Sequence, residues 1–107
     1  MAKKDIELVR YSEYWDPKWY ISQYKDVADA KVDPLEHFCS RGHRENRNPS
    51  IKFDTKRYRA LYDVGRDNPL VHYEKVGKYK GIIPPVTDYY LINNSKLFKK
   101  LGIELNI

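Results

Sequence analysis

Three histidines are the side chains in this sequence that most invite a metal or catalytic role. His37 and His72 each follow a proline by three positions, whereas His43 lies in a basic stretch. A structural zinc site needs four nitrogen or sulfur ligands, and no cysteine or carboxylate accompanies these histidines at a ligand spacing. We therefore predict no metal site. We expect His37 and His72 to pack and hydrogen-bond at matching places, and His43 to be exposed.

Two aspartates, Asp16 and Asp54, are the carboxylate pair that acid–base catalysis would use. Each precedes a stretch with helical spacing, where an aspartate has a simpler role as an N-cap. Nothing in the spacing places the two across one cleft, as a glycosidase requires. The sequence also lacks a glycine-rich phosphate loop, a nucleophile elbow and an HExxH motif. We predict that the chain is not an enzyme and carries no cofactor.

Two basic stretches are the best candidates for a binding surface. "SRGHRENRNP" (40–49) contains three arginines, and "KVGKYKGIIPP" (75–85) holds a tyrosine between lysines. The helix dipole alone favours cations beside a helix C-terminus. Alternatively, these side chains form one anion-binding edge suited to an acidic sugar or a stacked base. The candidate ligand-binding residues here are Arg41, Arg44, Arg47, Lys78, Tyr79 and Lys80.

Composition limits the remaining classes of function. The chain has 107 residues, a formal net charge of +5 and ten tyrosines. Residues 51–86 hold eight basic and four acidic side chains, an excess that either attracts an anionic glycan, nucleic acid or membrane surface, or simply solvates one face. No apolar stretch approaches the roughly 20 residues of a membrane span, and no apolar signal-peptide core is present. Cys39, the one cysteine, is predicted to be buried in a reducing compartment, so we expect a cytoplasmic protein.

An internal repeat organises the chain. Residues 14–50 (copy one) match residues 51–86 (copy two), and copy two lacks about three residues after Tyr62. A period of this length indicates one duplicated supersecondary unit. The repeated structural positions are Asp16 and Asp54, Tyr20 and Tyr58, Tyr24 and Tyr62, Pro34 and Pro69, His37 and His72, and Gly42 and Gly77.

Each copy has the sequence signals of two short helices. An aspartate N-cap begins the first, in which Tyr20, Tyr24 and Val27 follow at helical spacing. A capped proline begins the second, and Gly42 or Gly77 ends it at the C′ position. Helices of about two turns are unstable alone. We therefore predict a compact all-α bundle of two tandem helix-turn-helix repeats, in a single domain.

The segments that flank the repeats are predicted to be helical as well. The N-terminal segment, residues 1–13, is predicted to be helical, with the helix itself over residues 5–13. Its inward-facing side chains are expected to be Ile6, Leu8 and Val9. The C-terminal segment, 87–107, should hold a short helix capped by Ser95 and ended by Gly102. Its apolar side chains are Leu97, Phe98 and Leu101.

Trp19 is a further candidate for contact with a ligand. It stands four residues after Trp15, so the two share one helix face or its edge. Their counterparts in copy two are Phe53 and Arg57. An aromatic residue in both copies predicts a core position for Trp15. Trp19 is predicted either to face a ligand or to pack against the N-terminal helix.

Together these motifs resemble a tandem repeat of bacterial glycosyltransferases and other surface-polysaccharide biosynthesis proteins. That repeat reads approximately Phe-Asp-x-x-x-Tyr-Leu, Tyr-x-Asp-Val, Asp-Pro-Leu-x-His-Tyr and Gly-x-x-Glu-Gly-Arg-x-Pro, and the resemblance covers about residues 14–85. Copy one matches it at Trp15, Asp16, Tyr20, Ile21, Tyr24, Asp26, Val27, Asp33, Pro34, Leu35, His37, Phe38, Gly42, Glu45, Asn46, Arg47 and Pro49. Copy two matches it at Phe53, Asp54, Tyr58, Tyr62, Asp63, Val64, Pro69, Leu70, His72, Tyr73, Gly77, Gly81 and Pro84.

Copy two departs from this pattern in two places. It lacks the full loop before Asn68, and Lys80 stands where the pattern is acidic. In the family, such repeats accompany catalytic domains without resembling them. The resemblance therefore implies polysaccharide assembly as a context and names no catalytic residue.

These observations lead to one functional hypothesis and two alternatives. We expect a non-catalytic accessory module of a bacterial glycosyltransferase or surface-polysaccharide system, which holds a glycan or docks a partner protein of that system. The first alternative is a small nucleic-acid-binding protein, suggested by the sequence pI of about 9.2 and the lysines around Tyr79. No helix-turn-helix or RNA-binding signature accompanies it. The second alternative is a structural spacer without a ligand.

Overall fold

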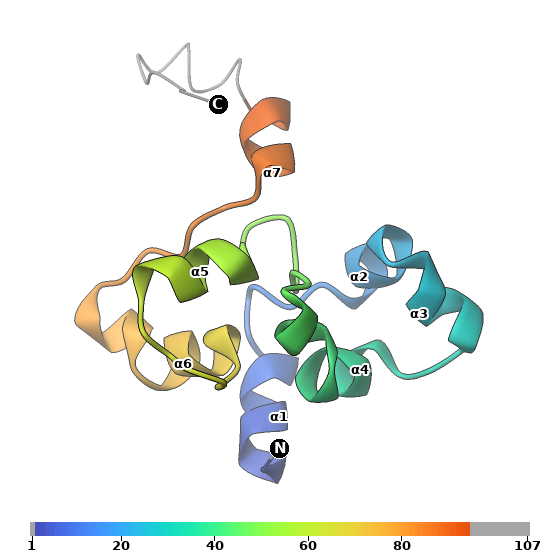
Figure 1. The fold of residues 1–107 in the computed structure, drawn as a ribbon, viewed down its shortest axis with the longest axis horizontal. Coiled ribbons are helices and arrows are strands. Elements are labelled where there is room, and N and C mark those ends of the chain that lie inside the picture. The colour runs from blue at the N-terminus through green and yellow to red at the C-terminus, as the bar shows by residue number, and fades with distance from the viewer. Residues whose placement is uncertain (1, 95–107) are drawn as a thin grey trace.

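The computed structural model describes residues 2–94 (Figure 1). Over this range the fold is all-α, as predicted, and the only β contact is an isolated bridge between Ser50 and Phe53. None of the helices in this range is long and apolar enough to cross a membrane. The helix predicted after Ser95 lies outside the described residues. The elements are α1 (Lys3–Arg10), α2 (Pro17–Gln23), α3 (Lys25–Ala30), α4 (Pro34–Ser40), the 3-10 helix η1 (Gly42–Glu45), α5 (Thr55–Leu61), α6 (Pro69–Lys75), the 3-10 helix η2 (Gly77–Lys80) and α7 (Asp88–Asn93).

The predicted N-caps begin the helices of both copies. Side-chain oxygens of Asp16 and Asp54 accept the backbone N–H three residues on, at 3.0 and 2.9 Å. The second helix of each copy begins in a similar way, because Asp33 and Asn68 accept the N–H two residues on, at 3.3 and 3.0 Å. Each cap satisfies a backbone donor that a helix start leaves without a partner.

The first helix of copy one is shorter than predicted. Tyr24 has φ −114° and ψ 85°, so its backbone leaves the helix and separates α2 from α3. Copy two has no counterpart of α3 and instead turns through Gly65, whose φ is +57°. Val27 and Val64 are nevertheless both buried. The shorter connection of copy two therefore retains the buried valine but lacks the helix, α3, that carries it in copy one.

Each copy packs four aromatic rings at its centre. The ring centroid of Tyr20 lies 5.3 Å from that of Trp15 and 4.8 Å from that of Tyr24. Tyr58 repeats this arrangement, at 5.2 Å from Phe53 and 4.9 Å from Tyr62. The fourth rings are Phe38 and Tyr73. Large rings at such separations bury much apolar area, so tyrosine supplies in this core the apolar bulk that leucine supplies in most proteins.

A buried hydrogen bond joins the two main helices of each copy. Tyr20 Oη and His37 Nδ1 are hydrogen-bonded at 2.8 Å, and Tyr58 Oη and His72 Nδ1 at 2.7 Å. Burial raises the pKa of Tyr20 and lowers the pKa of His37, so both groups are neutral at neutral pH. The prediction that the two histidines pack and hydrogen-bond at matching places is confirmed.

Gly42 and Gly77 occupy the predicted C′ positions for a reason that the sequence did not indicate. Neither is among the residues with positive φ, so a left-handed backbone is not what requires glycine. A Cβ at Gly42 would lie 2.1 Å from Tyr20 Oη, and one at Gly77 would lie 2.7 Å from Tyr58 Oη. Each hydroxyl is held by a histidine and its ring is fully buried, so it cannot move aside. The tyrosine therefore excludes any larger residue.

Helix α1 is the packing partner that the two copies share. It packs against α4 of copy one and α6 of copy two, which lie on either side of it in Figure 1. Val9 is fully buried, and Ile6 and Leu8 pack against the core, as predicted. The loop after α1 adds Tyr14, whose ring lies 5.8 Å from Phe53. The N-terminal helix and the loop after it thus join the buried residues of both copies into one continuous core.

Beyond the Pro84–Pro85 break, the chain returns to the start of copy two and then leaves it. Asp54 donates its N–H to Pro85 O at 2.8 Å, and Thr87 donates its N–H to Ile51 O at 3.1 Å. Thr87 also caps α7, a helix that the sequence analysis did not predict. Figure 1 shows α7 pointing away from the bundle.

Replacing Gly42 by alanine is expected to lower the free energy of unfolding by about 1–3 kcal/mol, the usual cost of overpacking a core. In a Tyr20→Phe background the cost should shrink, because the hydroxyl oxygen is the atom that clashes. Gly77→Ala should cost less than Gly42→Ala, since its clash is milder. Urea unfolding of four variants measures these costs: Gly42→Ala, Tyr20→Phe, the two changes combined, and Gly77→Ala. An equal cost of Gly42→Ala in both backgrounds would show that the hydroxyl is not the constraint.

Candidate functional site

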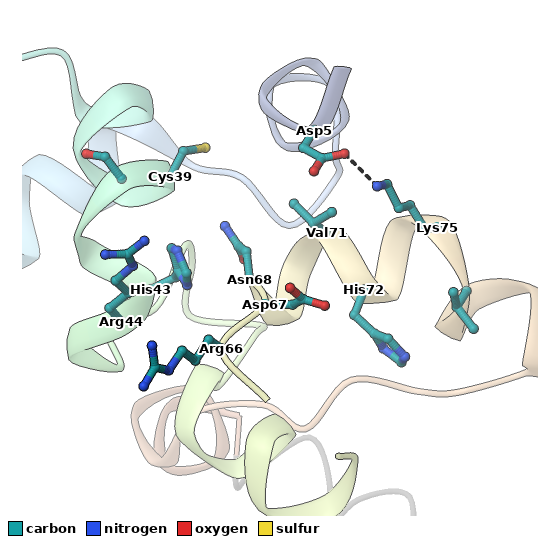
Figure 2. Close-up of a pocket in the computed structure, with 12 residues that line it drawn as sticks. Asp5, Cys39, His43, Arg44, Arg66, Asp67, Asn68, Val71, His72 and Lys75 are labelled. Atoms are coloured by element: carbon teal, nitrogen blue, oxygen red, sulfur yellow. Dashed lines mark ion pairs between the residues drawn. The ribbon is translucent and has the colours of Figure 1, made fainter. Parts of the chain in front are cut away.

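A polar cleft lies between copy one and copy two, and Figure 2 shows its lining. Its cavity measures about 420 Å³. One wall comes from α4 and η1, and the other from residues 66–68 and α6. Asp5 of α1 lies at one end, where its carboxylate binds Lys75 Nζ at 2.7 Å. We call this the inter-repeat cleft, with principal lining residues Ser40, His43, Arg44, Arg66, Asp67, Asn68 and Val71.

Two exposed arginines, one from each copy, lie at the same end of this cleft (Figure 2). Arg44 belongs to η1 of copy one, and Arg66 to the loop before α6 of copy two. Within residues 2–94, neither guanidinium has a hydrogen-bond or ion-pair partner. Both also line an adjoining cavity of about 490 Å³, together with Asn46, Arg59 and Gly65. Five free N–H donors on each guanidinium are thus available to a ligand.

His43 is buried, with only 4% of its surface exposed, so the expectation that it is exposed is wrong. Arg59 of copy two covers it, donating from Nη2 to His43 O at 3.0 Å and to His43 Nδ1 at 3.1 Å. Because a guanidinium only donates, Nδ1 must be unprotonated. Arg59 Nη1 also donates to Gly65 O at 2.8 Å. This one side chain links the two copies beside the cleft.

The cleft has more positive than negative charge at its arginine end. Burial, together with the nearby charges of Arg59 and Arg44, lowers the pKa of His43 to about 4, so the imidazole is neutral. Burial also lowers the pKa of Arg59. Of the two lining carboxylates, Asp5 is neutralised by a lysine, which leaves Asp67. An anion is the ligand that this balance favours.

Asn68 contributes a buried donor without an acceptor. Its Oδ1 accepts the N–H of Leu70 at 3.0 Å, which fixes the orientation of the amide. Its Nδ2 is buried and has no hydrogen-bond partner. Figure 2 shows this nitrogen directed into the space between α4 and α6. An unpaired buried donor costs about 1–3 kcal/mol, which an acceptor atom of a ligand would recover.

The arginines predicted from the first basic stretch lie close together. Arg41, Arg44 and Arg47 line a shallow pocket of about 300 Å³ that adjoins the inter-repeat cleft at Arg44. Arg47, however, is engaged within its own copy. It donates to both oxygens of Asp26, at 2.8 and 2.7 Å, and its guanidinium lies 4.9 Å from the ring centre of Tyr24. Arg41 and Arg44 remain exposed.

Lys75 of the second basic stretch lines the inter-repeat cleft, but the candidate residues Lys78, Tyr79 and Lys80 do not. These three belong to η2, which Figure 1 places at the far edge of copy two, so η1 and η2 do not form one edge. Lys78 Nζ lies 3.1 Å from Glu74 Oε2 and 5.2 Å from the ring centre of Tyr79. Tyr79 is 76% exposed, and Lys80 is exposed as well. Trp19 is half-buried, with its ring edge-on to Tyr24.

Sequence reasoning missed three contributors to the cleft. Arg59 and Arg66 stood out only as part of the basic excess of copy two, and Asn68 was assigned to a helix start. The signal that could have drawn attention to Arg66 is its place in the shortened connection, where the copies differ. No pattern within one copy indicates that these residues face the other copy.

Comparison with family models, with curated proteins and with solved structures finds no match to this chain. Among the residues that the structure describes, no group of three or more histidine, cysteine, aspartate or glutamate side chains could hold a metal ion. The chemistry that the cleft offers is hydrogen bonding and attraction of negative charge.

Acidification is expected to destabilise the protein between about pH 6.5 and pH 4. The folded-state pKa of His43 is about 4, whereas an unfolded chain has the ordinary value of about 6.5. As the pH falls through this window, the unfolded state binds a proton that the folded state does not, so the free energy of unfolding decreases. Below pH 4 both states are protonated and the loss, about 3 kcal/mol, is complete.

Urea unfolding at a series of pH values measures this dependence against a His43→Gln variant. The variant should be less stable at neutral pH and should lose most of the dependence. His37 contributes the remainder with the same sign, because burial and then Arg47 lower its pKa. A variant whose stability falls with pH as steeply as that of the parent would contradict the assignment.

Proposed function

We propose that this chain is a non-catalytic accessory module that binds a glycan within a bacterial surface-polysaccharide assembly system. The resemblance of residues 14–85 to repeats of such systems supplies the context. The inter-repeat cleft is the observation that carries the binding role. Its arginine, asparagine and aspartate side chains offer donors and acceptors in a concave site, which suits a ligand rich in hydroxyl groups.

The contacts of the chemically capable side chains support a role without catalysis. His37 and His72 are hydrogen-bonded to buried tyrosines, and His43 is bound by Arg59. Asp16 and Asp54 cap helices. Each of these residues therefore has a structural role that accounts for its presence.

A polysaccharide-biosynthesis protein is the other partner within this proposal. A glycan is favoured because the cleft is hollow and polar, whereas most protein contacts have an apolar centre. We also propose a cytoplasmic location. Its support is the free thiol of Cys39, which is buried and whose pKa burial raises to about 12, as is typical of an inert cysteine.

A second candidate function is nucleic-acid binding, which the η2 surface favours. Tyr79 is exposed between Lys78 and Lys80, and an exposed ring beside cations can stack on a base. This candidate predicts an affinity that falls steeply with salt concentration.

An amide NMR titration of the labelled protein separates these functions. Neutral and acidic oligosaccharides and a short single-stranded RNA would each be added at low and at moderate salt. We expect the oligosaccharides to shift signals at the inter-repeat cleft and to do so at both salt concentrations. Shifts with RNA alone, centred on η2 and removed by salt, would instead favour the second candidate. Transfer or hydrolysis of a sugar by the protein would contradict the proposal.

A further inference from the structure

We infer that the inter-repeat cleft binds the oxyanion group of an acidic glycan, with Arg44 and Arg66 as its guanidinium contacts and Asn68 Nδ2 as a buried donor. The inference rests on the proposed function and adds to it the class of glycan and the site. The group in question is a carboxylate or a phosphate carried by the sugar.

The unpaired state of Arg44 and Arg66 is the first step of the argument. Most other arginines of the described chain have partners: Arg10 pairs with Glu7, Arg47 with Asp26 and Arg57 with Asp88. Arg44 and Arg66 have none, although they line the same two cavities. The planar fork of a guanidinium matches the two oxygens of a carboxylate or phosphate, so this pair offers strong and directed contacts to such a group.

The surroundings of the pair strengthen its preference for an anion. The adjoining cavity has a third guanidinium, that of Arg59, and no acidic side chain of the described residues lines it. Arg59 is itself anchored to His43 and Gly65, so it stays in place when a ligand enters. In the described cleft, Asp67 is the one carboxylate without a basic partner. Its single negative charge is outnumbered by the guanidinium groups of Arg44, Arg66 and Arg59.

Asn68 supplies an independent observation that points to a ligand. Its Oδ1 is used by the helix cap, while Nδ2 has no acceptor and almost no contact with solvent. A ligand oxygen reaches this nitrogen only when the cleft widens slightly. A sugar oxygen or one oxygen of the anion would satisfy the donor.

A sugar suits this cleft better than a nucleic acid does. Sites for single strands stack bases on aromatic rings, and among residues 2–94 no tyrosine, tryptophan or phenylalanine lines either cavity. The exposed aromatic ring between lysines lies on η2, away from the cleft. The lining instead combines guanidinium, amide and carboxylate groups, which pair with a charged and hydroxylated ligand.

The test compares three probes: a short galacturonic acid oligomer, its methyl ester and a sugar phosphate. Esterification removes the charge and leaves the sugar, so the free acid should bind and the ester should bind at least about tenfold more weakly. The variant Arg44→Gln with Arg66→Gln should weaken binding of the free acid by about tenfold or more. The matched variant Lys18→Gln with Lys56→Gln removes the same charge from exposed sites outside both cavities and should leave binding within about twofold.

A further variant, Asn68→Ser, keeps an oxygen that can cap α6 and removes the amide donor. It should remain folded and bind the acid about threefold or more weakly. Binding of the sugar phosphate with the same loss in the arginine variant would also support the inference and would identify phosphate as an accepted group.

Four results would overturn it. Equal affinity for the acid and its ester, or equal losses in the arginine and lysine variants, would remove the oxyanion site while leaving glycan binding intact. Failure of all three probes to bind would rule out both the oxyanion site and the proposed glycan-binding function. Displacement of the bound acid by single-stranded RNA, with RNA affinity lost in the arginine variant, would assign the cleft to nucleic acid.

Discussion

The hydrogen bond between a buried tyrosine hydroxyl and a histidine ring is the constraint on which the rest of this structure depends. The tyrosine places a large ring at the centre of each copy, but its hydroxyl is costly to bury without a partner. His37 and His72 meet that need from the second helix of each copy, at 2.8 and 2.7 Å. The same hydroxyl leaves no space for a side chain at the following glycine. Tyrosine, histidine and glycine therefore act as one unit.

This framework decides which side chains are left for binding. The histidines bind tyrosines and the aspartates cap helices, whereas Arg44, Arg66 and Asn68 Nδ2 remain without partners in the part of the cleft that the structure describes. Helix α1 packs between α4 and α6, and this arrangement brings η1 of copy one to the loop before α6 of copy two. The cleft is thus a consequence of how the two copies pack against one shared helix.

The two copies share this framework but differ in two places: at residues 47 and 82, and in the connection before the second helix of each copy. Arg47 and Ile82 both donate an N–H to the framework glycine, at 2.9 and 3.0 Å, so they occupy equivalent places. In copy one the arginine pairs with Asp26, whereas in copy two the isoleucine packs against the core. Copy two also shortens the connection before α6, which carries Arg66. This second difference makes the cleft asymmetric, with Arg44 from a 3-10 helix on one side and Arg66 from a loop on the other.

The sequence by itself determined the features that act within one or two turns of chain. The N-caps at Asp16 and Asp54, the presence of an N-terminal helix, the all-α class and the paired roles of His37 and His72 all follow from residue type and spacing, because such signals operate locally. Tertiary structure alone decided the burial of His43 beneath Arg59, the steric reason for Gly42, and the meeting of Arg44 with Arg66. Each of these depends on contacts between residues far apart in sequence, and no local pattern specifies how two separately capped units pack around a shared helix.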